Sequence, residues 1–572
     1  MDQTIFEETM DNPSVEKYAV SKEMLYVQDQ QGGAYNGQVR LDTSILANSG
    51  RWCDYKEGYL EVPFKITFKS SVDSTGAGVI NGFILGLKNG NHHLVNSLKV
   101  DYNNTTLVQA TDLRNVFVGY KLMSSFSEDD LKKHGATIGF HPDSAGSYNF
   151  AVAASRNGEG HCNNVVNPVA ATPVWAGGVA AADAISGSSL DSYNKGFLER
   201  LKTTSFGAMT ADVSYGGVPV LGTDLATVQP KCQDMRKNFV TDNAEQKDDR
   251  VWQWNITATI RLKDICDLFA EMPIVKGAFM KLTIGYNSTT YSITSAAAAS
   301  PTLIHATITQ RTGRCSPIMM ASAGATNPCA SLLDGTNTIS CGIGTGVPNQ
   351  IGNYSNDSVR LYVPAYELSP QREKELLTRL PERDVYYNDI FLTEITSISA
   401  GSTFNEIITN GQENLQYIVV VPVLNSVAGN AATLLLDPLQ SIFDSCPGTT
   451  CPLASITNFN VQVSGKNVFQ ENVDYDYSAF CDELQSINAL NGGVTTGLTS
   501  GLISKYDFDN AYRYYVADLS RYSVEDEGIP KSVTVKGKNN TAKIMNYYCF
   551  LVHRKQITIN MSNGGLKASD TA

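Results

Sequence analysis

The 572-residue sequence lacks the motifs of the common catalytic and nucleotide-binding sites and has few charged residues. It contains no GxSxG, GxxxxGK[ST], HExxH or calcium-loop pattern, which argues against several large enzyme classes. Charged residues make up 18%, and the net charge is -13, so broad electrostatic binding to nucleic acid is disfavoured. We therefore predict that the protein is not an enzyme, with no catalytic, cofactor-binding or metal-binding residues and no sequence-specific nucleic acid binding.

Long apolar runs are also missing. The most notable one, Tyr417 to Leu424, is far shorter than the roughly 20 residues that a membrane-spanning helix needs. The N-terminal segment is acidic, with Asp2 and Glu7, and has neither a basic arm nor the apolar core of a signal peptide. We expect that the chain has no transmembrane segment and no secretory signal, and that it is made inside a cell.

Two adjacent histidines, His92 and His93, are the first candidate for a metal site. Apolar and polar residues alternate from Leu98 to Tyr102, and Asn103 and Asn104 tolerate the positive φ of a tight turn, so this stretch predicts a β-hairpin. On a strand, neighbouring side chains point to opposite faces, so the two histidines cannot easily hold one ion. We predict no ordered metal there.

The remaining candidates for chemistry have plainer explanations. The GTG stretch near Gly342, within CGIGTGVPNQ, is interpreted as linker, without the strand and helix of a phosphate site. The acidic pair Asp129-Asp130 and the run Glu525 to Glu527 could supply the two carboxylates of a glycosidase, but a helix start and a solvated turn explain them better.

Eleven scattered cysteines contain one close pair, Cys446 and Cys451. A reduced pair or a disulfide that staples a loop explains it better than zinc, because no second pair follows. Sequons at Asn104 and Asn255 are explained by the abundance of Asn and Thr.

Strands dominate both halves of the sequence. Leu60, Val62, Phe64, Ile66 and Phe68 alternate with polar residues, which is typical of a half-buried strand, and Pro63 suggests an edge or a bulge. Later stretches rich in Val, Tyr, Phe and Ile repeat this pattern: VRLYVPAYEL, QYIVVVPVL, FNVQVSGKNVF, YRYYVADL and SVTVKGKN.

Similar signals recur in the same order in the two halves. VRL begins a strand at Val39 and again at Val359, and SGKN at 464–467 matches the Asn103-Asn104 turn. Each half then has apolar residues at helical spacing: Val116, Tyr120 and Met123 in the first, and Phe480, Leu484 and Ile487 in the second. We interpret the chain as one unit used twice.

Shorter helices have readable ends. Ser127 is expected to cap a helix over 128–134 that Gly135 ends, and Ser369 with Pro370 starts a helix that Pro381 ends. An apolar stripe within 262–272 predicts a third helix, ended by Pro273.

These signals predict an N-terminal arm at 1–23, a first β unit at 24–320 with a long insertion at about 141–250, a linker at 321–358 and a second β unit at 359–572. The second half expands at 425–458 instead, and both insertions should project from the ends of the sandwiches.

Five stretches, in order, resemble the double jelly-roll major capsid proteins of polinton-like viruses and virophages: GLKNGNHHLVNSLKVDYNNTTLVQ, SEDDLKKHGATIGFHPDSAGSY, ITATIRLKDICDLFAEMPIVKGAFMKLTIGYN, RLYVPAYELSP and GLISKYDFDNAYRYYVADLSR. The resemblance covers both halves, from about residue 24 to 562, and leaves out the long insertion and the linker.

This resemblance implies an all-β chain with two tandem eight-stranded jelly-roll sandwiches, short connecting helices and long loop insertions. It further implies homotrimers with a pseudo-hexagonal outline that tile an icosahedral shell, the virion capsid, around double-stranded DNA, with penton and minor capsid proteins as partners. Two alternatives stay open: a trimeric viral spike or adhesin, and a carbohydrate-binding β-sandwich protein, although Trp52, Trp175, Trp252 and Trp254 form no obvious platform.

Overall fold

The computed structural model describes most of both halves of the chain. The described residues are 19–70, 83–143, 196, 200, 250–296, 302–322, 335–348, 358–425, 439–440, 454–490, 499–510, 512–522, 529–541 and 544–569. None of the helices in these residues is long and apolar enough to cross a membrane.

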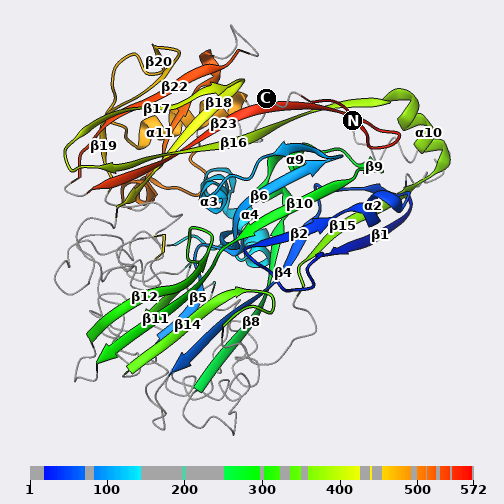
Figure 1. Cartoon of the computed structure of the whole chain (residues 1–572). Coiled ribbons are helices and arrows are strands. Elements are labelled where there is room, and N and C mark those ends of the chain that lie inside the picture. Colours follow the sequence, from blue (N-terminus) through cyan, green and yellow to red (C-terminus); the bar gives the residue numbers. More distant parts are fainter. Residues whose placement is uncertain are drawn as a thin grey trace.

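The first unit is a sandwich of two four-stranded layers (Figure 1). One layer has the order β1-β15-β4-β8 and contains β1 (Ala19–Gln28), β15 (Arg360–Leu368), β4 (Tyr59–Ser70) and β8 (Arg250–Arg261). The other has the order β2-β10-β6-β7 and contains β2 (Gln38–Asp42), β10 (Met280–Tyr286), β6 (Val95–Tyr102) and β7 (Thr105–Val108). Two short strands, β3 (Trp52–Cys53) and β9 (Val275–Lys276), extend the first layer beside β15.

The second unit repeats this connectivity. One layer has the order β16-β23-β18-β21 and contains β16 (Glu382–Ile398), β23 (Met545–Asn560), β18 (Leu415–Leu424) and β21 (Tyr515–Asp518), with β24 (Leu566–Ser569) beside β23. The other has the order β17-β22-β19-β20 and contains β17 (Thr403–Gln412), β22 (Lys531–Asn539), β19 (Ile456–Val463) and β20 (Lys466–Asn467). Because the eight strands of each unit pair in the same order, the predicted double jelly roll is confirmed.

The strand order corrects two details of the sequence interpretation. The VRL stretches are not equivalent, because Val39 lies in β2 while Val359 precedes β15, a strand of the other layer. The predicted linker is also not all loop, because β14 (Gly335–Ile343) pairs with β4. The division at 359 stays a prediction, but strand pairing favours a later boundary, after Leu368, since β15 belongs to the first unit.

Among the described residues, the first unit has further strands between β10 and β15, and the second unit has none between the equivalent strands β22 and β23 (Figure 1). The strands β11 (Ser288–Ala296), β12 (Thr302–Thr312) and β14 add to β4, and β13 (Ile318–Ser322) pairs with β5 (Phe83–Leu87). The sequence interpretation missed β11, β12 and β14 because these three strands are rich in Thr and Ser rather than large apolar residues.

The two predicted hairpins are confirmed. Asn103 and Asn104 join β6 to β7 with φ values of 47° and 66°, and Ser464 and Gly465 join β19 to β20 with 48° and 82°. Both central residues have positive φ, as the right-handed twist of a two-residue hairpin requires. These turns therefore fix the register of the two short outer strands.

Strand β4 shows why the Pro63 prediction was wrong. Its side chains Leu60, Val62, Phe64 and Ile66 are buried as expected. Pro63 lies inside the sheet, where the neighbour of β4 changes from β15, paired up to Glu61, to β14, paired from Phe64. The missing N–H of Pro63 therefore falls in the gap between the partner strands β15 and β14, so no hydrogen bond between paired strands is lost.

The helices lie between and around the sheets: α2 (Ser44–Asn48), η2 (Asn91–Leu94), α3 (Arg114–Ser125), α4 (Glu128–Ile138), α8 (Leu262–Ile265), α9 (Asp267–Glu271), α10 (Pro370–Arg379), α11 (Tyr477–Leu490), α12 (Lys505–Asn510) and η8 (Ser520–Tyr522). The helix predicted at 262–272 is two short ones, interrupted by extended Cys266. Ser127 caps α4 through a capping box, but the helix ends at Gly139, with φ of 63°, rather than at Gly135.

The expected insertion at 141–250 and the expansion at 425–458 lie largely outside the described residues. One described residue of the insertion, Arg200, is fully buried in the first unit. Its guanidinium donates to the Leu87 carbonyl at 2.8 Å and to the Asp143 carboxylate at 2.7 Å. The Tyr512 hydroxyl of the second unit donates to the Asp143 carbonyl at 2.8 Å, so this point of the insertion is tied to both units.

Candidate functional site: the junction between the two units

Helix α3 is the element around which the two units meet. Val116, Tyr120 and Met123 are buried, as predicted, and the helix is buried on almost every side. Its Phe117 ring lies 5.7 Å from Phe550 of β23, and its Tyr120 ring lies 5.1 Å from Tyr514, edge to face. A helix that is buried nearly all round is covered on both sides, so α3 is a packing layer between the units.

A buried ion cluster lies at the start of α3. Asp389 of β16 accepts from the Lys555 ammonium of β23 at 2.8 Å, and the Arg114 guanidinium of α3 lies 3.7 Å from the same carboxylate. Arg114 also donates to the Ile265 carbonyl at 2.8 Å. The side chains of Arg114 and Asp389 are only 2% and 3% exposed, so their charges interact with little screening by water.

Hydrogen bonds near this cluster also join the units. The Tyr387 hydroxyl donates to the Leu107 carbonyl at 2.9 Å, and the Thr111 hydroxyl donates to the Ile390 carbonyl at 3.0 Å. Arg314 forms a bidentate pair with Glu394, across the same boundary. These contacts fix the two sandwiches against each other through many directional bonds rather than through one flexible linker.

At the other end of the junction, the connecting helix α10 is anchored through one carboxylate. Glu373 accepts from the Trp52 indole N–H at 3.2 Å and from the Lys276 ammonium at 2.7 Å. The Tyr102 hydroxyl of β6 donates to the Gly564 carbonyl, which precedes β24, at 2.7 Å. Both ends of the junction are therefore closed by polar contacts.

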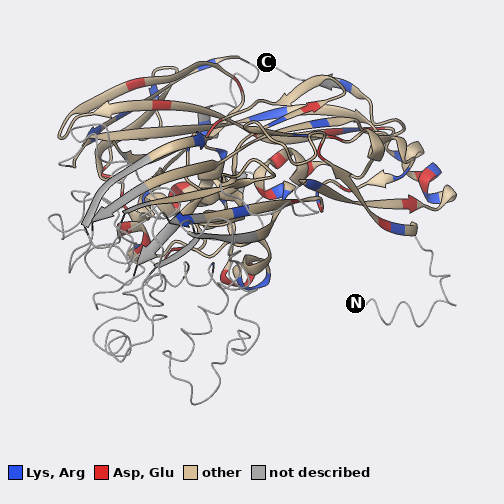
Figure 2. Ribbon diagram, turned by 60° about the horizontal axis from the view of Figure 1, so that its bottom comes forward, with Lys and Arg blue, Asp and Glu red and all other residues tan. Residues whose placement is uncertain are grey.

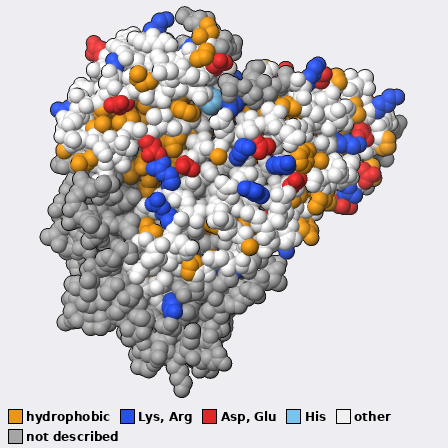
Figure 3. Space-filling view, in the orientation of Figure 1, with side chains coloured by type: hydrophobic (Ala, Val, Ile, Leu, Met, Phe, Trp, Pro, Cys, Tyr) orange, Lys and Arg blue, Asp and Glu red, His pale blue; other side chains and the backbone are white. Residues whose placement is uncertain are grey.

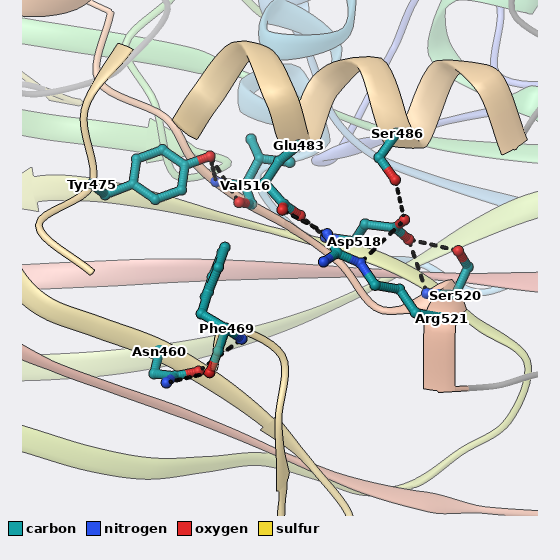
Figure 4. Close-up of polar contacts among 9 residues, drawn as sticks. All are labelled: Asn460, Phe469, Tyr475, Glu483, Ser486, Val516, Asp518, Ser520 and Arg521. Carbon is teal, nitrogen blue, oxygen red and sulfur yellow. Dashed lines mark hydrogen bonds and ion pairs between the residues drawn. The ribbon is translucent and has the colours of Figure 1, made fainter. Parts of the chain in front are cut away.

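In the second unit, α11 is attached to its sheet by a polar network (Figure 4). The Asp518 amide donates to Glu483 at 2.7 Å, and the Ser486 hydroxyl donates to the Asp518 carboxylate at 2.6 Å. Arg521 forms an ion pair with Glu483 at 2.6 Å. The helix predicted from Phe480, Leu484 and Ile487 is confirmed, and this network sets its position along β21.

The histidine pair is buried in the first unit. His92 and His93 lie on the 3-10 turn η2, not on a strand, so the alternation argument used for them was wrong in its premise. The Asn89 amide group lies 3.2 Å from His92 Nε2, and the Asn115 amide group lies 3.1 Å from His93 Nδ1. Burial, with the nearby Arg200 charge, lowers the pKa of His92 to about 3, so it is neutral at physiological pH.

Other candidates for chemistry are dispersed. Asp129 and Asp130 lie in the first turn of α4, and Gly342 lies within β14, so a strand does precede the GTG stretch, contrary to the interpretation from sequence. Glu525 to Glu527 and Cys446 with Cys451 lie outside the described residues. Within the described part of the chain, no three His, Cys, Asp or Glu side chains are placed to hold a metal ion.

The described surface carries mixed charge. Basic and acidic residues are interspersed along both units in Figure 2, and hydrophobic side chains are scattered over the face in Figure 3. Several large apolar side chains are nevertheless more than 40% exposed, including Val20 and Tyr26 of β1 and Ile407 of β17. Exposed apolar residues that are scattered singly are normal on protein surfaces.

Comparisons with known proteins agree with the fold. No family model matches the chain, and no curated protein matches it. A chain in the cryo-EM structure of the Sputnik virophage is similar at a TM-score of 0.50 and 10% identity, with 100% of this chain and 93% of that chain covered. The mavirus major capsid protein is similar at a TM-score of 0.42 and 10% identity, with 98% of this chain and 92% of that chain covered. The Faustovirus major capsid protein is similar at a TM-score of 0.40 and 10% identity, with 97% of this chain and 94% of that chain covered.

Proposed function

We propose that this chain is a major capsid protein that forms the shell of a double-stranded DNA virus. The observation that carries the proposal is the duplicated jelly roll, joined through one buried junction, whose fold matches a chain of the Sputnik virophage over its whole length. A shell subunit needs defined shape rather than an active site. The internally paired polar groups at the junction suit that role.

The capsomer in this proposal is a homotrimer. Two similar sandwiches per chain give six per trimer, and six similar bodies around a closed threefold ring approximate a hexagon. Hexagonal units cover a surface without gaps, with penton and minor capsid proteins at the positions that hexagons cannot fill. The protein would then be located in the virion, around the genome.

Lateral contacts between trimers would be individually weak. A surface of interspersed charges favours modest contacts, and their repetition over a shell supplies stability through multivalency. Within the trimer, the interfaces should be larger, typically above about 2,000 Å² for obligate contacts. The exposed apolar residues named above are candidates for those interfaces.

The test is to measure the mass and shape of purified protein. Light scattering should give about three times the 62.0 kDa chain mass, and electron microscopy should show hexagonal outlines that form sheets or shells when concentrated. A monomer at micromolar concentration would contradict the proposal. Threefold particles that never tile would favour a spike or adhesin instead.

A further inference from the structure

The internal duplication relates the junction inside the chain to two surfaces on its outside. By strand order, β1 corresponds to β16 and β15 to β23. Helix α3, between β7 and β8, corresponds to α11, between β20 and β21. At the junction, α3 of the first unit packs on β23 of the second. The corresponding contact would place α11 of one chain on β1 and β15 of another.

The junction uses the outer face of the layer that contains β23. Tyr547 of β23 stacks on Phe404 of β17 at 4.8 Å, inside the sandwich. Phe550, three residues along, points the opposite way because side chains alternate on a strand, and its ring lies 5.7 Å from Phe117 of α3. Val552 points to the same side as Phe550, and both side chains are fully buried.

The corresponding outer face of the first unit carries a row of tyrosines. Tyr26 of β1 pairs with Tyr362 of β15, which pairs with Tyr59 of β4, and directly opposite residues share one face of a sheet. Their ring centroids lie 5.9 Å and 5.2 Å apart. Leu361 and Val363 of β15 are fully buried in the sandwich, so the tyrosine row points outward.

This outer face is exposed, apolar and cationic. Val20, Met24 and Tyr26 are 61%, 49% and 55% exposed, and they share one side of β1, so they form a continuous face rather than single exposed residues. The Lys22 ammonium lies 5.3 Å from the Tyr366 ring, and the Arg360 guanidinium lies 5.6 Å from the Tyr26 ring. The carboxylate on this face is Glu61, opposite Arg360. We call this surface the tyrosine face: Val20, Lys22, Met24, Tyr26, Tyr59, Glu61, Arg360, Tyr362 and Tyr366.

The region around α11 has the opposite charge. The sequence from Val468 to Leu490 contains five carboxylates and no Lys or Arg. Glu483 is buried and paired with Arg521, whereas the other four carboxylates are exposed. Asp482 lies on the outward stripe of α11, between Ser478 and Gln485. We call this surface the acidic face: Glu471, Asp474, Asp476, Ser478, Asp482 and Gln485.

We propose that the tyrosine face of one copy of this chain binds the acidic face of a second copy. Tyrosines are frequent anchors of protein interfaces, and the opposite charges of the two faces fix their orientation. The inference rests on the proposed capsid function, because it identifies the contact that holds the trimer together.

The positions of the two faces suit a closed ring. In Figure 1, α11 and β1 lie at opposite sides of the molecule. A contact between two different surfaces of identical chains is head-to-tail, and such contacts close into a ring when the rotation allows it. In a trimer, three contacts of this kind alternate with the three internal junctions, so that all six units are joined in the same way.

The first test is photo-cross-linking of the full chain with Tyr26→benzoylphenylalanine, in trimers that contain both isotope-labelled and unlabelled copies. We expect cross-links from position 26 to peptides within 468–490, with one labelled and one unlabelled partner. Tyr386→benzoylphenylalanine is the matched control, because Tyr386 is an exposed tyrosine on the corresponding strand β16 and also lies under an arginine, Arg554. Trimers in which position 26 links only to another region, or only within its own chain, would overturn the proposal.

The second test compares Tyr26→Ala with Tyr386→Ala by light scattering over a range of concentrations. We expect Tyr26→Ala to weaken trimer formation by about tenfold or more, and Tyr386→Ala to leave it unchanged, with equal circular dichroism of the two variants. Asp482→Lys should weaken the trimer from the other side of the same contact. Equal trimer formation by Tyr26→Ala and Tyr386→Ala would overturn this interface but leave the capsid proposal intact, whereas monomeric wild-type protein would refute the capsid function itself.

Discussion

Replacement of Asp389 by alanine should strongly destabilise the junction. Asp389 is the single carboxylate between Lys555 and Arg114, and its side chain is 3% exposed. Without it, two cations whose side chains are 10% and 2% exposed remain in the junction with no carboxylate between them. The buried Ile390 amide also loses its acceptor.

The magnitude follows from the cost of an uncompensated buried charge. Removal of one partner from a buried ion pair typically costs about 3–5 kcal/mol. The lost hydrogen bond to the Ile390 amide belongs to the same site and is included in this range. Typical domains are stable by about 5–15 kcal/mol, so such a loss would remove a large part of the stability of the joined units.

Urea unfolding followed by tyrosine and tryptophan fluorescence measures this loss, and calorimetry shows whether the units still unfold together. The matched control is Asp509→Ala, because the Asp509–Lys505 pair is exposed and should contribute nothing measurable. A variant with Arg114→Met, Asp389→Leu and Lys555→Met should recover stability, since apolar residues of similar volume often replace buried ion clusters without loss.

Two results would contradict this reasoning. If Asp389→Ala unfolds at the same urea concentration as Asp509→Ala, the cluster does not hold the units together. If Asp389→Ala is destabilised but the apolar triple variant is equally so, the geometry of the strands rather than unpaired charge determines the loss.

Three further predictions concern pH, a turn and an insertion. Burial lowers the pKa of His553 to about 4, below its unfolded value near 6.5. Between these two pH values the unfolded chain binds more protons than the folded protein. The contribution of His553 to stability is therefore full above pH 6.5 and declines towards pH 4. In urea unfolding, the free energy of unfolding should fall by about 2–3 kcal/mol through this group between pH 7 and pH 4.5. The His553→Gln variant should show a smaller fall over the same pH range. Gly465→Val should cost about 1–2 kcal/mol in the same assay, because φ of 82° is strained for a β-branched residue; an unchanged midpoint would contradict this. A peptide tag inserted after Gly178, outside the described residues, should leave the yield of trimers unchanged and should be bound by an antibody on assembled particles. The same tag after Val62 should abolish trimers, because it shifts the strand register. A Gly178 tag that the antibody does not reach in intact particles would show that this loop is a buried contact.

Local features of this fold could be predicted from the sequence because local physics determines them. The Asn103-Asn104 turn, the Pro370 helix start and the apolar face of α11 each depend on a few neighbouring residues. Strand assignment between layers could not be predicted this way, because the same letters VRL occur within β2 and at the start of β15, from Val359, but the two strands pair in different sheets. Sheet membership depends on distant partners.

The junction was missed for the same reason. Lys555 and Asp389 are 166 residues apart, and Arg114 comes from the other unit, so no spacing rule connects them. A lysine within β23 and an aspartate within β16 each look like solvent-facing strand residues in isolation. Only the packing of the units shows that these charges are buried together.

The duplication also bears on symmetry. If the two units of each chain were identical, a ring of three chains would present six equal faces, and neighbouring trimers could meet in either of two rotations. Among the described strands, β11, β12 and β14 have no counterpart in the second unit, where residues 540–544 separate the equivalent strands β22 and β23. This difference makes alternate corners of the proposed hexagon unequal. The shape of the trimers alone would therefore make the two rotations between neighbouring trimers unequal. The additional strands achieve this without a change to the eight-stranded pairing that both units share.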